Sequence, residues 1–350
     1  MTTAPGRATA PDTATAPDTA AEAGTAARPR AATARGPATG TAVALTGATG
    51  FIGSGVLAAL RARGVRVRAL ARRPPRSAAP GTDWVPGDLV DGTGLAALCA
   101  GAGVLVHLAA RVDGCAEDCE AANVRGTAAL MAAATRAGVR RIVHLSTTAV
   151  YGEGPHAGID VDEVPPAPVS EASRTRLLGE RHALEAGAYV LRPGLVTGAG
   201  DRWVVPSLAE VVRRVPVRWE GGDARLSVVD RTDLARLVTA LALDDHTAPP
   251  GVHHASHPAP VRSGDLLDAL AALGLLPGLD GPAVPWEECR RLLAAAPGRV
   301  SERQFAMVAR DHWYRSDSVW RQAGCPPGPG PLARLPEAAA WYREVLGQSG

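Results

Sequence analysis

The chain has 350 residues, and its 37 basic and 35 acidic side chains leave a formal net charge of +2. A charge this close to zero gives no electrostatic reason to expect a nucleic acid or an anionic membrane surface as a partner. The hydrophobic content of 46% is ordinary for a globular protein, and no apolar run approaches the roughly 18 residues of a membrane span. All basic residues are arginine, which excludes any mechanism that requires a lysine. The five cysteines lack zinc-finger spacing, so we expect a reduced, cytoplasmic protein without disulfides or a metal site.

Residues 1–40 are mainly Ala, Thr, Pro, Gly and Asp, with almost no large apolar side chains. Such a segment cannot bury enough apolar surface to offset the entropy lost on ordering, so it is predicted to be a disordered tail.

From Thr41 onward, apolar runs of strand length alternate with helical segments. The expected elements are a strand, glycine turn and helix over 41–64, strands over 65–72 and 103–110, a helix over 123–138, a strand and turn over 140–152, a helix over 171–184 and a strand over 189–198. This alternation predicts an α/β protein with a Rossmann-type, doubly wound parallel sheet over 41–200. Residues 201–350 are irregular and carry nine of the 13 aromatic residues, so we expect mainly a smaller C-terminal, substrate-binding lobe, with some segments returning to the sheet.

Three glycines follow the first expected strand and lead into the first expected helix. Gly47, Gly50 and Gly53 form the pattern G-x-x-G-x-x-G. The first glycine allows a tight turn, the second allows the backbone to approach a pyrophosphate, and the third allows close contact between helix and strand. In this strand–turn–helix context the pattern predicts a dinucleotide site.

The residues after the second expected strand distinguish the two nicotinamide dinucleotides. NAD sites place an acidic residue there, whereas NADP sites place an arginine. This chain has Arg72, Arg73 and Arg76, with no acidic residue before Asp83. Their guanidinium groups suit the 2′-phosphate of NADPH, although NADH stays possible because the same residues also fit a solvated basic loop.

Further motifs follow the glycine turn in a definite order: GDLVD (87–91), HLAA (107–110), NVRGT (123–127), STTAVYG (146–152) and LRPGLVTGAGD (191–201). With TGATGFIG (46–53), they resemble the extended short-chain dehydrogenases/reductases, in the epimerase/dehydratase branch. The resemblance implies that the active-site hydroxyl falls on Thr147, beside Ser146, and that Asn123 is structural. It also implies cofactor contacts by Gly47, Thr49, Gly50, Phe51, Ile52, Gly53, Asp88, Leu89, Leu108, Ala109, Ala110, Pro193, Gly194, Leu195 and Val196.

That family normally uses Tyr-x-x-x-Lys on the helix after STTAVYG, with the tyrosine as proton donor. Aligning RTRLLGE (174–180) with the family pattern places Ala172 at the tyrosine and Arg176 at the lysine. No tyrosine lies between residues 152 and 188, so a shifted alignment does not restore the pair. Arg176 can still hold the ribose hydroxyls, but Ala172 has no proton to give.

Three consequences of the missing proton donor are open. In the first, another side chain replaces the tyrosine as proton donor, and the candidates are Tyr151, His156 and Thr147. In the second, the substrate supplies its own proton. In the third, the protein is a non-catalytic NADP-binding regulator. Atypical short-chain reductases of aromatic polyketide pathways also lack the pair. We therefore expect an NADPH-dependent ketoreductase whose partner is a small-molecule aromatic ketone, with Tyr151 and Trp203 at the substrate pocket. A nucleotide-sugar epimerase or dehydratase is less favoured because it requires the acid/base pair.

Three further polar features were considered as candidate site residues. His253, His254 and His257 lack a carboxylate at ligand spacing and are expected in a strand-edge loop. Asp233 is predicted to cap the helix that follows it. Arg192 has two open interpretations, contact with the pyrophosphate or pairing with a carboxylate.

Overall fold

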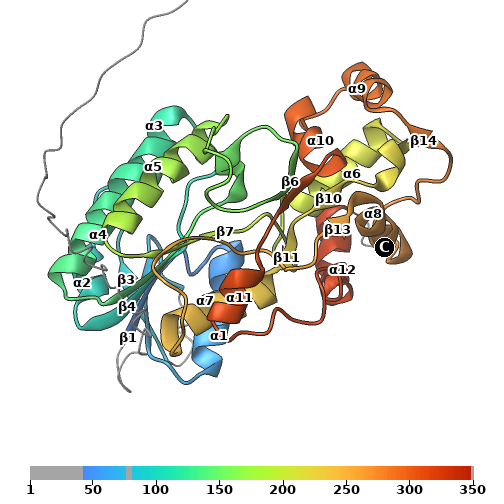
Figure 1. Ribbon diagram of the computed structural model, residues 1–350. Helices are drawn as coiled ribbons and strands as arrows, with labels where there is room; N and C mark the ends of the chain where they lie inside the picture. Colours follow the sequence, from blue (N-terminus) through green and yellow to red (C-terminus); the bar gives the residue numbers. More distant parts are fainter. Residues whose placement is uncertain (1–41, 76–80, 348–350) are drawn as a thin grey trace, which may run out of the picture. The chain divides into compact units, whose positions relative to one another are not determined.

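The centre of the protein is a seven-stranded, fully parallel sheet in the order β12-β7-β5-β4-β1-β2-β3 (Figure 1). The computed structural model describes residues 42–75 and 81–347. The tail predicted over 1–40 therefore lies outside the described residues, as do Thr41 and Arg76. The strands are β1 (Ala42–Thr46), β2 (Val67–Ala71), β3 (Thr82–Pro86), β4 (Ala102–His107), β5 (Arg141–Leu145), β7 (Tyr189–Arg192) and β12 (Gly251–His254).

Helices cover both faces of this sheet, which confirms the predicted doubly wound α/β class. Alternate side chains of β1 face opposite sides, with Val43 and Leu45 in one buried cluster and Ala44 in another. The first face carries α1 (Phe51–Ala62), α7 (Arg231–Leu243) and α11 (Asp317–Gln322). The second carries α2 (Leu95–Cys99), α3 (Ala116–Cys119), a π-helical segment (Glu120–Gly126), α4 (Thr127–Arg136) and α5 (Glu171–Glu185).

A further buried cluster, which includes Trp219, Phe305 and Tyr342, forms most of the core of the C-terminal lobe. Its helices are α6 (Val204–Arg214), α8 (Ser263–Ala272), α9 (Trp286–Ala295), α10 (Glu302–Ala309) and α12 (Leu335–Val345). A four-stranded sheet, β13-β10-β15-β6, contains β13 (Val261–Arg262), β10 (Arg225–Leu226), β15 (His312–Tyr314) and β6 (His156–Ile159). Two short parallel pairs join β8 (Leu195–Thr197) to β11 (Val228–Asp230) and β9 (Arg218–Trp219) to β14 (Ala283–Val284).

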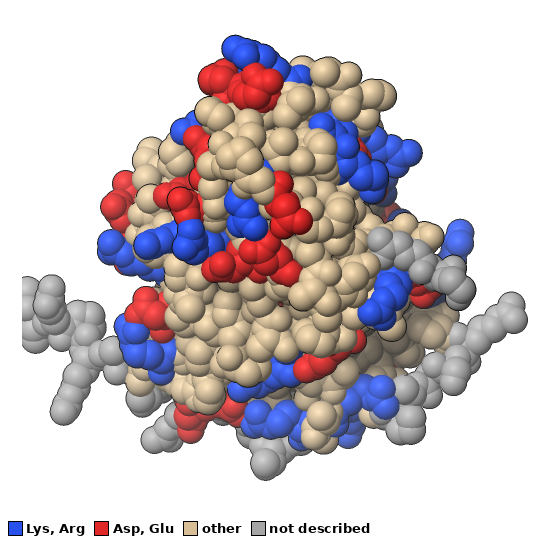
Figure 2. All heavy atoms as spheres, turned by 90° about the vertical axis from the view of Figure 1, so that its right-hand side faces the viewer, with Lys and Arg blue, Asp and Glu red and all other residues tan. Residues whose placement is uncertain are grey.

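The chain crosses between the two regions more than once. β6 precedes residue 200 yet pairs with β15, and β12 follows residue 200 yet pairs with β7. His253 and His254 therefore lie within an edge strand of the main sheet, and only His257 follows it in a loop. Figure 2 shows basic and acidic side chains interspersed over one face, as the near-zero net charge predicts. No helix among the described residues is long and apolar enough to cross a membrane.

One element prediction was wrong for an identifiable reason. The strand expected over 189–198 is two strands in different sheets, β7 and β8, separated by Pro193 and Gly194. Proline has no N–H for a ladder, and a Cβ at Gly194 would lie 2.4 Å from the carbonyl oxygen of Ser227. The strand and turn expected over 140–152 are both present, because β5 ends at Leu145 and a 3₁₀ turn follows over Thr148–Tyr151.

The predicted cap of the helix after residue 230 was also wrong. α7 begins at Arg231, and the Asp230 carboxylate accepts a hydrogen bond from the Thr232 N–H at 2.6 Å. Asp233 is instead buried and pairs with Arg236 and Arg334 at 2.9 and 3.0 Å. The Arg334 pair ties α7 to the C-terminal lobe.

Candidate functional site

The turn between β1 and α1 requires glycine at two positions. Gly47 has φ +74°, and a Cβ there would lie 2.7 Å from the backbone nitrogen of Ala109. A Cβ at Gly53 would lie 1.9 Å from the carbonyl oxygen of Gly47. Both distances are too short for any side chain. Glycine at positions 47 and 53 therefore allows α1, the turn and the end of β4 to pack together.

The N-terminus of α1 follows the glycine turn directly and has no side-chain cap. Gly50 is the N-cap residue. Unpaired N–H groups at the start of a 12-residue helix bind an anion well, with support from the helix dipole. This geometry fits the pyrophosphate of a dinucleotide.

A cavity of about 500 Å³ extends from this turn. Most of the predicted cofactor residues line it, namely Gly47, Thr49, Gly50, Phe51, Ile52, Gly53, Arg72, Asp88, Leu89, Leu108, Ala109, Ala110 and Arg176. The sequence prediction missed Thr46, Leu70, Ala71, Gly87, Val112 and Leu145, which also line it. Most of these directly adjoin predicted residues at strand ends, whereas Val112 has no sequence signal.

The end of the cavity near β2 carries positive charge. Arg72 lines the cavity and is exposed, and Arg73 beside it is also exposed but is not part of the lining. Asp88 accepts a hydrogen bond from the Val90 N–H at 3.0 Å, so its own turn is fixed. No acidic residue follows β2 within 72–75.

Arg176 reaches the cavity from the middle of α5. One terminal nitrogen donates to the carbonyl oxygen of Leu145 at 3.2 Å, while Nε is buried without a partner. Burial lowers the Arg176 pKa to about 10. Below this helix, His107 hydrogen-bonds to Thr46 and Thr127 at 2.7 and 3.0 Å, and burial lowers its pKa to about 4. With a pKa of about 10, Arg176 is charged at neutral pH, and it lines the cofactor cavity.

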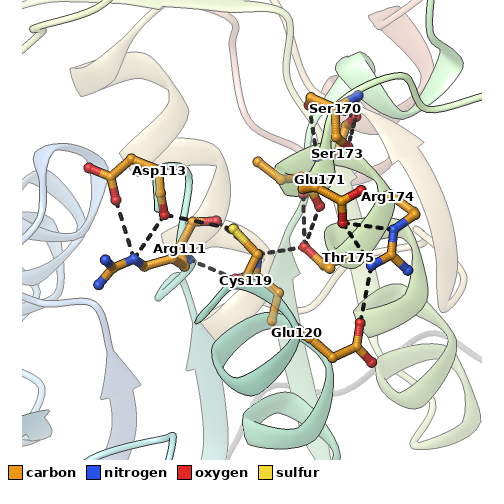
Figure 3. Close-up of polar contacts among 11 residues, drawn as sticks. Arg111, Asp113, Cys119, Glu120, Ser170, Glu171, Ser173, Arg174 and Thr175 are labelled. Carbon is orange, nitrogen blue, oxygen red and sulfur yellow. Dashed lines mark hydrogen bonds and ion pairs between the residues drawn. The ribbon is translucent and has the colours of Figure 1, made fainter. Parts of the chain in front are cut away.

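The first turn of α5, which carries Ala172, is fixed by polar contacts (Figure 3). Ser170 and Ser173 form a capping box, and Arg174 bridges Glu171 and Glu120 at 2.8 and 3.4 Å. The methyl group of Ala172 provides no proton. The helix that normally carries the family tyrosine is thus held in place without one.

Asn123 is structural, as the sequence predicted. It is buried, accepts a hydrogen bond from the Arg111 N–H at 2.7 Å and donates to Thr175 Oγ1 at 2.9 Å. These bonds connect α5 to the segment after β4, where Arg111 also contacts Asp113 (Figure 3).

Thr147 and Ser146 follow β5 but have different surroundings. Thr147 Oγ1 accepts a hydrogen bond from the Ala149 N–H at 3.1 Å, and its proton has no acceptor among the described residues. Thr147 lines a second, small cavity of about 50 Å³ with Gly194 and Leu195. Ser146 is buried, and its hydroxyl has no partner. Thr147 is therefore the hydroxyl that can donate into a cavity.

The loop predicted to contact the nicotinamide, residues 193–196, also has residues in different surroundings. The Pro193 carbonyl accepts a hydrogen bond from the Thr148 N–H at 3.0 Å, which fixes the loop beside the Thr147 turn. Gly194 and Leu195 line the small cavity rather than the large one, and Val196 is buried in β8.

The structure places the two aromatic residues predicted for the substrate pocket differently. Trp203 lines the large cavity and is 59% exposed. Tyr151 is 1% exposed and lines neither cavity. Its hydroxyl contacts His254 and Arg192 at 2.7 and 2.9 Å, and burial raises its pKa. Tyr151 therefore belongs to a buried network and is not placed to protonate a substrate.

The same network decides the role of Arg192. Its guanidinium donates two hydrogen bonds to Glu180, at 3.0 and 2.6 Å, and both side chains are buried. Arg192 thus pairs with a carboxylate rather than with the pyrophosphate. His156 is also buried, with Nε2 unpartnered, and lines neither of these two cavities.

The parallel sheet, the glycine turn and the adjoining cavity together define a Rossmann protein with a dinucleotide site. The model of the NAD-dependent epimerase/dehydratase family matches residues 43–253, more than half of the chain. The chain therefore belongs to that family.

Two relatives have reductase names. The chain is 33% identical over 240 residues to 4-hydroxy-2-methyl-3-oxo-4-farnesyl-3,4-dihydroquinoline-1-oxide ketoreductase from Stigmatella aurantiaca, covering 65% of this chain and 71% of that protein. It is 27% identical over 317 residues to 2-alkyl-3-oxoalkanoate reductase from Stenotrophomonas maltophilia, covering 81% and 94%. Family and relatives together identify an NAD(P)-dependent oxidoreductase.

A similar solved structure supports the fold. It is a short-chain dehydrogenase/reductase superfamily protein from Agrobacterium tumefaciens with bound NAD. The TM-score is 0.67 at 24% identity, and the match covers 88% of this chain and 98% of that chain.

Proposed function

We propose that this protein is an NADPH-dependent ketoreductase that reduces a ketone of an angucyclinone-like aromatic polyketide. The observation that carries the proposal is the combination at the end of β5 and on α5. Arg176 lines the cofactor cavity and Thr147 has a free hydroxyl proton, whereas Ala172 removes the usual proton donor. These residues retain cofactor and carbonyl binding without a side chain that completes protonation.

The Stigmatella relative supports the substrate class. Its name describes a ketone next to a hydroxyl-bearing carbon on a fused bicyclic ring. Aromatic polyketides often place a phenol beside a ketone, which gives an internal hydrogen bond. The exposed indole of Trp203 at the large cavity suits a flat aromatic ligand.

The chain's own residues bind and orient the reactants. When bound, the nicotinamide supplies the hydride that reduces the carbonyl carbon. Thr147 donates a hydrogen bond to the carbonyl oxygen, and this donor strengthens as negative charge develops there. Arg176, which lines the cofactor cavity, holds the ribose hydroxyls. The neighbouring phenol of the substrate gives its proton to the new alkoxide, leaving a phenolate that solvent protonates.

The preference for NADPH rests on Arg72 and Arg73. Both are exposed and follow β2, and Arg72 lines the cavity. An arginine at this position pairs with the 2′-phosphate, whereas the ribose hydroxyls of NADH require an acidic partner there.

The test compares two ketones that differ only in the internal proton. We expect the full chain to oxidise NADPH, followed at 340 nm, with 8-hydroxy-1-tetralone at least about tenfold faster than with its methyl ether. Equal rates would overturn the substrate-proton mechanism. NADPH binding without oxidation by any hydroxylated aromatic ketone would overturn the reductase proposal in favour of a regulatory NADP-binding protein.

Restoring the family pair provides a second test. Ala172→Tyr combined with Arg176→Lys should change the rate with the hydroxyketone less than about tenfold, because the substrate already supplies the proton. A gain of about 10²–10⁴-fold, the usual contribution of a positioned general acid, would refute this mechanism. NADPH affinity, measured by fluorescence, serves as the control for folding.

A further inference from the structure

A third cavity, of about 430 Å³, lies in the C-terminal lobe. One wall is formed by α10 and by Trp286 at the start of α9, and the opposite wall by the segment 153–155 after the Thr148–Tyr151 turn. None of its lining residues belongs to the large cofactor cavity.

This third cavity adjoins the small cavity at Thr147. Met307 and His312 line both of them. The two cavities are therefore neighbours that meet at Met307 and His312, one reaching Thr147 and the other Trp286. A ligand whose carbonyl lies at Thr147 would extend its remaining rings along Met307 towards Trp286.

The α10 wall combines apolar surface with two unpaired cations. Ala306, Met307 and Trp286 supply the apolar part. Arg303 and Arg310 are half-buried, and no carboxylate among the described residues forms an ion pair with either. The Arg310 guanidinium lies over the Trp286 ring, 5.7 Å from its centre.

The acidic residues of the cavity do not neutralise these arginines. Glu302 is held by Arg290, whose Nε lies 2.6 Å from its carboxylate. Glu153 is exposed and stands on the opposite wall. Because the α10 wall keeps two free guanidinium groups, it attracts an anionic group on the ligand.

His312 adds a hydrogen-bond acceptor at the junction of the two cavities. Its Nδ1 donates to the Arg310 carbonyl oxygen at 3.1 Å, so Nε2 carries no proton in the neutral ring. The side chain is 8% exposed, and Nε2 has no partner among the described residues. A buried, unpartnered acceptor is costly unless a ligand or a water donates to it.

We propose that the two neighbouring cavities open into one another and together bind a planar aromatic acid, with its ketone at Thr147 and its carboxylate on Arg303 and Arg310. His312 accepts a hydrogen bond from a hydroxyl group between these two ends. The inference rests on the proposed ketoreductase function for the position of the ketone, and it adds an acidic group to the substrate.

Equilibrium binding tests this assignment without any turnover. The probes are anthraquinone-2-carboxylate and anthraquinone-2-carboxamide, titrated by calorimetry into the full chain bound to NADP⁺, which has no hydride to transfer. We expect the carboxylate to bind at least about tenfold more tightly, as one charge-assisted contact provides. Arg303→Gln with Arg310→Gln should abolish this preference, and Glu153→Gln should strengthen it.

Arg299→Gln is the matched control, because this exposed arginine of the same lobe lines none of the cavities. It should leave the preference unchanged, and all variants should bind NADPH like the wild type. Equal affinity for acid and amide, or an unchanged preference in the double arginine variant, overturns the assignment. This readout is separate from the reductase assay, so a protein that binds the acid selectively but never oxidises NADPH would refute only the proposed activity.

Discussion

Replacing Gly47 with alanine gives the sharpest test of the dinucleotide site. The left-handed backbone at φ +74° costs a residue with a Cβ about 1–2 kcal/mol. In addition, the new Cβ would lie 2.7 Å from the Ala109 nitrogen and 2.8 Å from the Leu108 carbonyl carbon. Both are backbone atoms that cannot rotate away, so the turn must move from the end of β4. We expect NADPH affinity to fall at least about tenfold, equivalent to about 1.4 kcal/mol.

Gly64→Ala is the matched control for backbone strain. Gly64 follows the other end of α1 with a similar φ of +69°, and an added Cβ meets nothing within 4 Å. This variant should lose about 1–2 kcal/mol of unfolding free energy in urea and keep its NADPH affinity. Affinity is measured by the fluorescence of bound NADPH in both variants. Wild-type affinity in Gly47→Ala, or an equal loss in the two variants, would refute the placement of the pyrophosphate at this turn.

Two further predictions concern cofactor choice and pH. Arg72→Ala should lower the ratio of kcat/KM for NADPH to that for NADH at least about tenfold, because a charge-assisted hydrogen bond is worth about 1.5–3 kcal/mol. Arg66 is an exposed arginine away from the cavity, and Arg66→Ala is the control. An equal change of the ratio in both variants would contradict this prediction. Burial lowers the pKa of His107 from 6.5 to about 4. Because the unfolded chain binds a proton more readily than the folded chain, the free energy of unfolding is highest above pH 6.5 and falls as the pH drops from 6.5 towards 4. At pH 5 this lowers the free energy of unfolding by about 2 kcal/mol. His107→Gln should therefore show a smaller fall in the free energy of unfolding between pH 7 and pH 5 than the wild type. An identical fall in both proteins would argue against a buried neutral imidazole.

The sequence by itself determined the sheet class and most of the cofactor cavity. Gly47 and Gly53 are local signals, because Gly47 has φ +74° and a Cβ at Gly53 would lie 1.9 Å from the carbonyl oxygen of Gly47. The absence of lysine and the replacement at Ala172 are likewise readable without a structure. These features depend on residues that are near one another in the chain, and that is why pattern reasoning found them.

Only the tertiary structure decided which polar residues are free to act. Tyr151 and Arg192 appear as candidate site residues in the sequence, but long-range contacts with His254 and Glu180 bury them in a network of their own. Asp230, rather than Asp233, caps α7 because the helix begins three residues earlier than its apolar pattern indicates.

The cavity between Thr147 and Trp286 has no signature in the sequence. The part near Trp286 is lined by residues 153–155 and by residues from the range 286–312, and the pairing of β6 with β15 brings these two segments together. Apolar and arginine residues on α10 look like an ordinary half-buried helix face until that pairing places them opposite the Thr147 turn. Local chemistry therefore predicts the cofactor turn, whereas strand pairing across the chain determines where a substrate can lie.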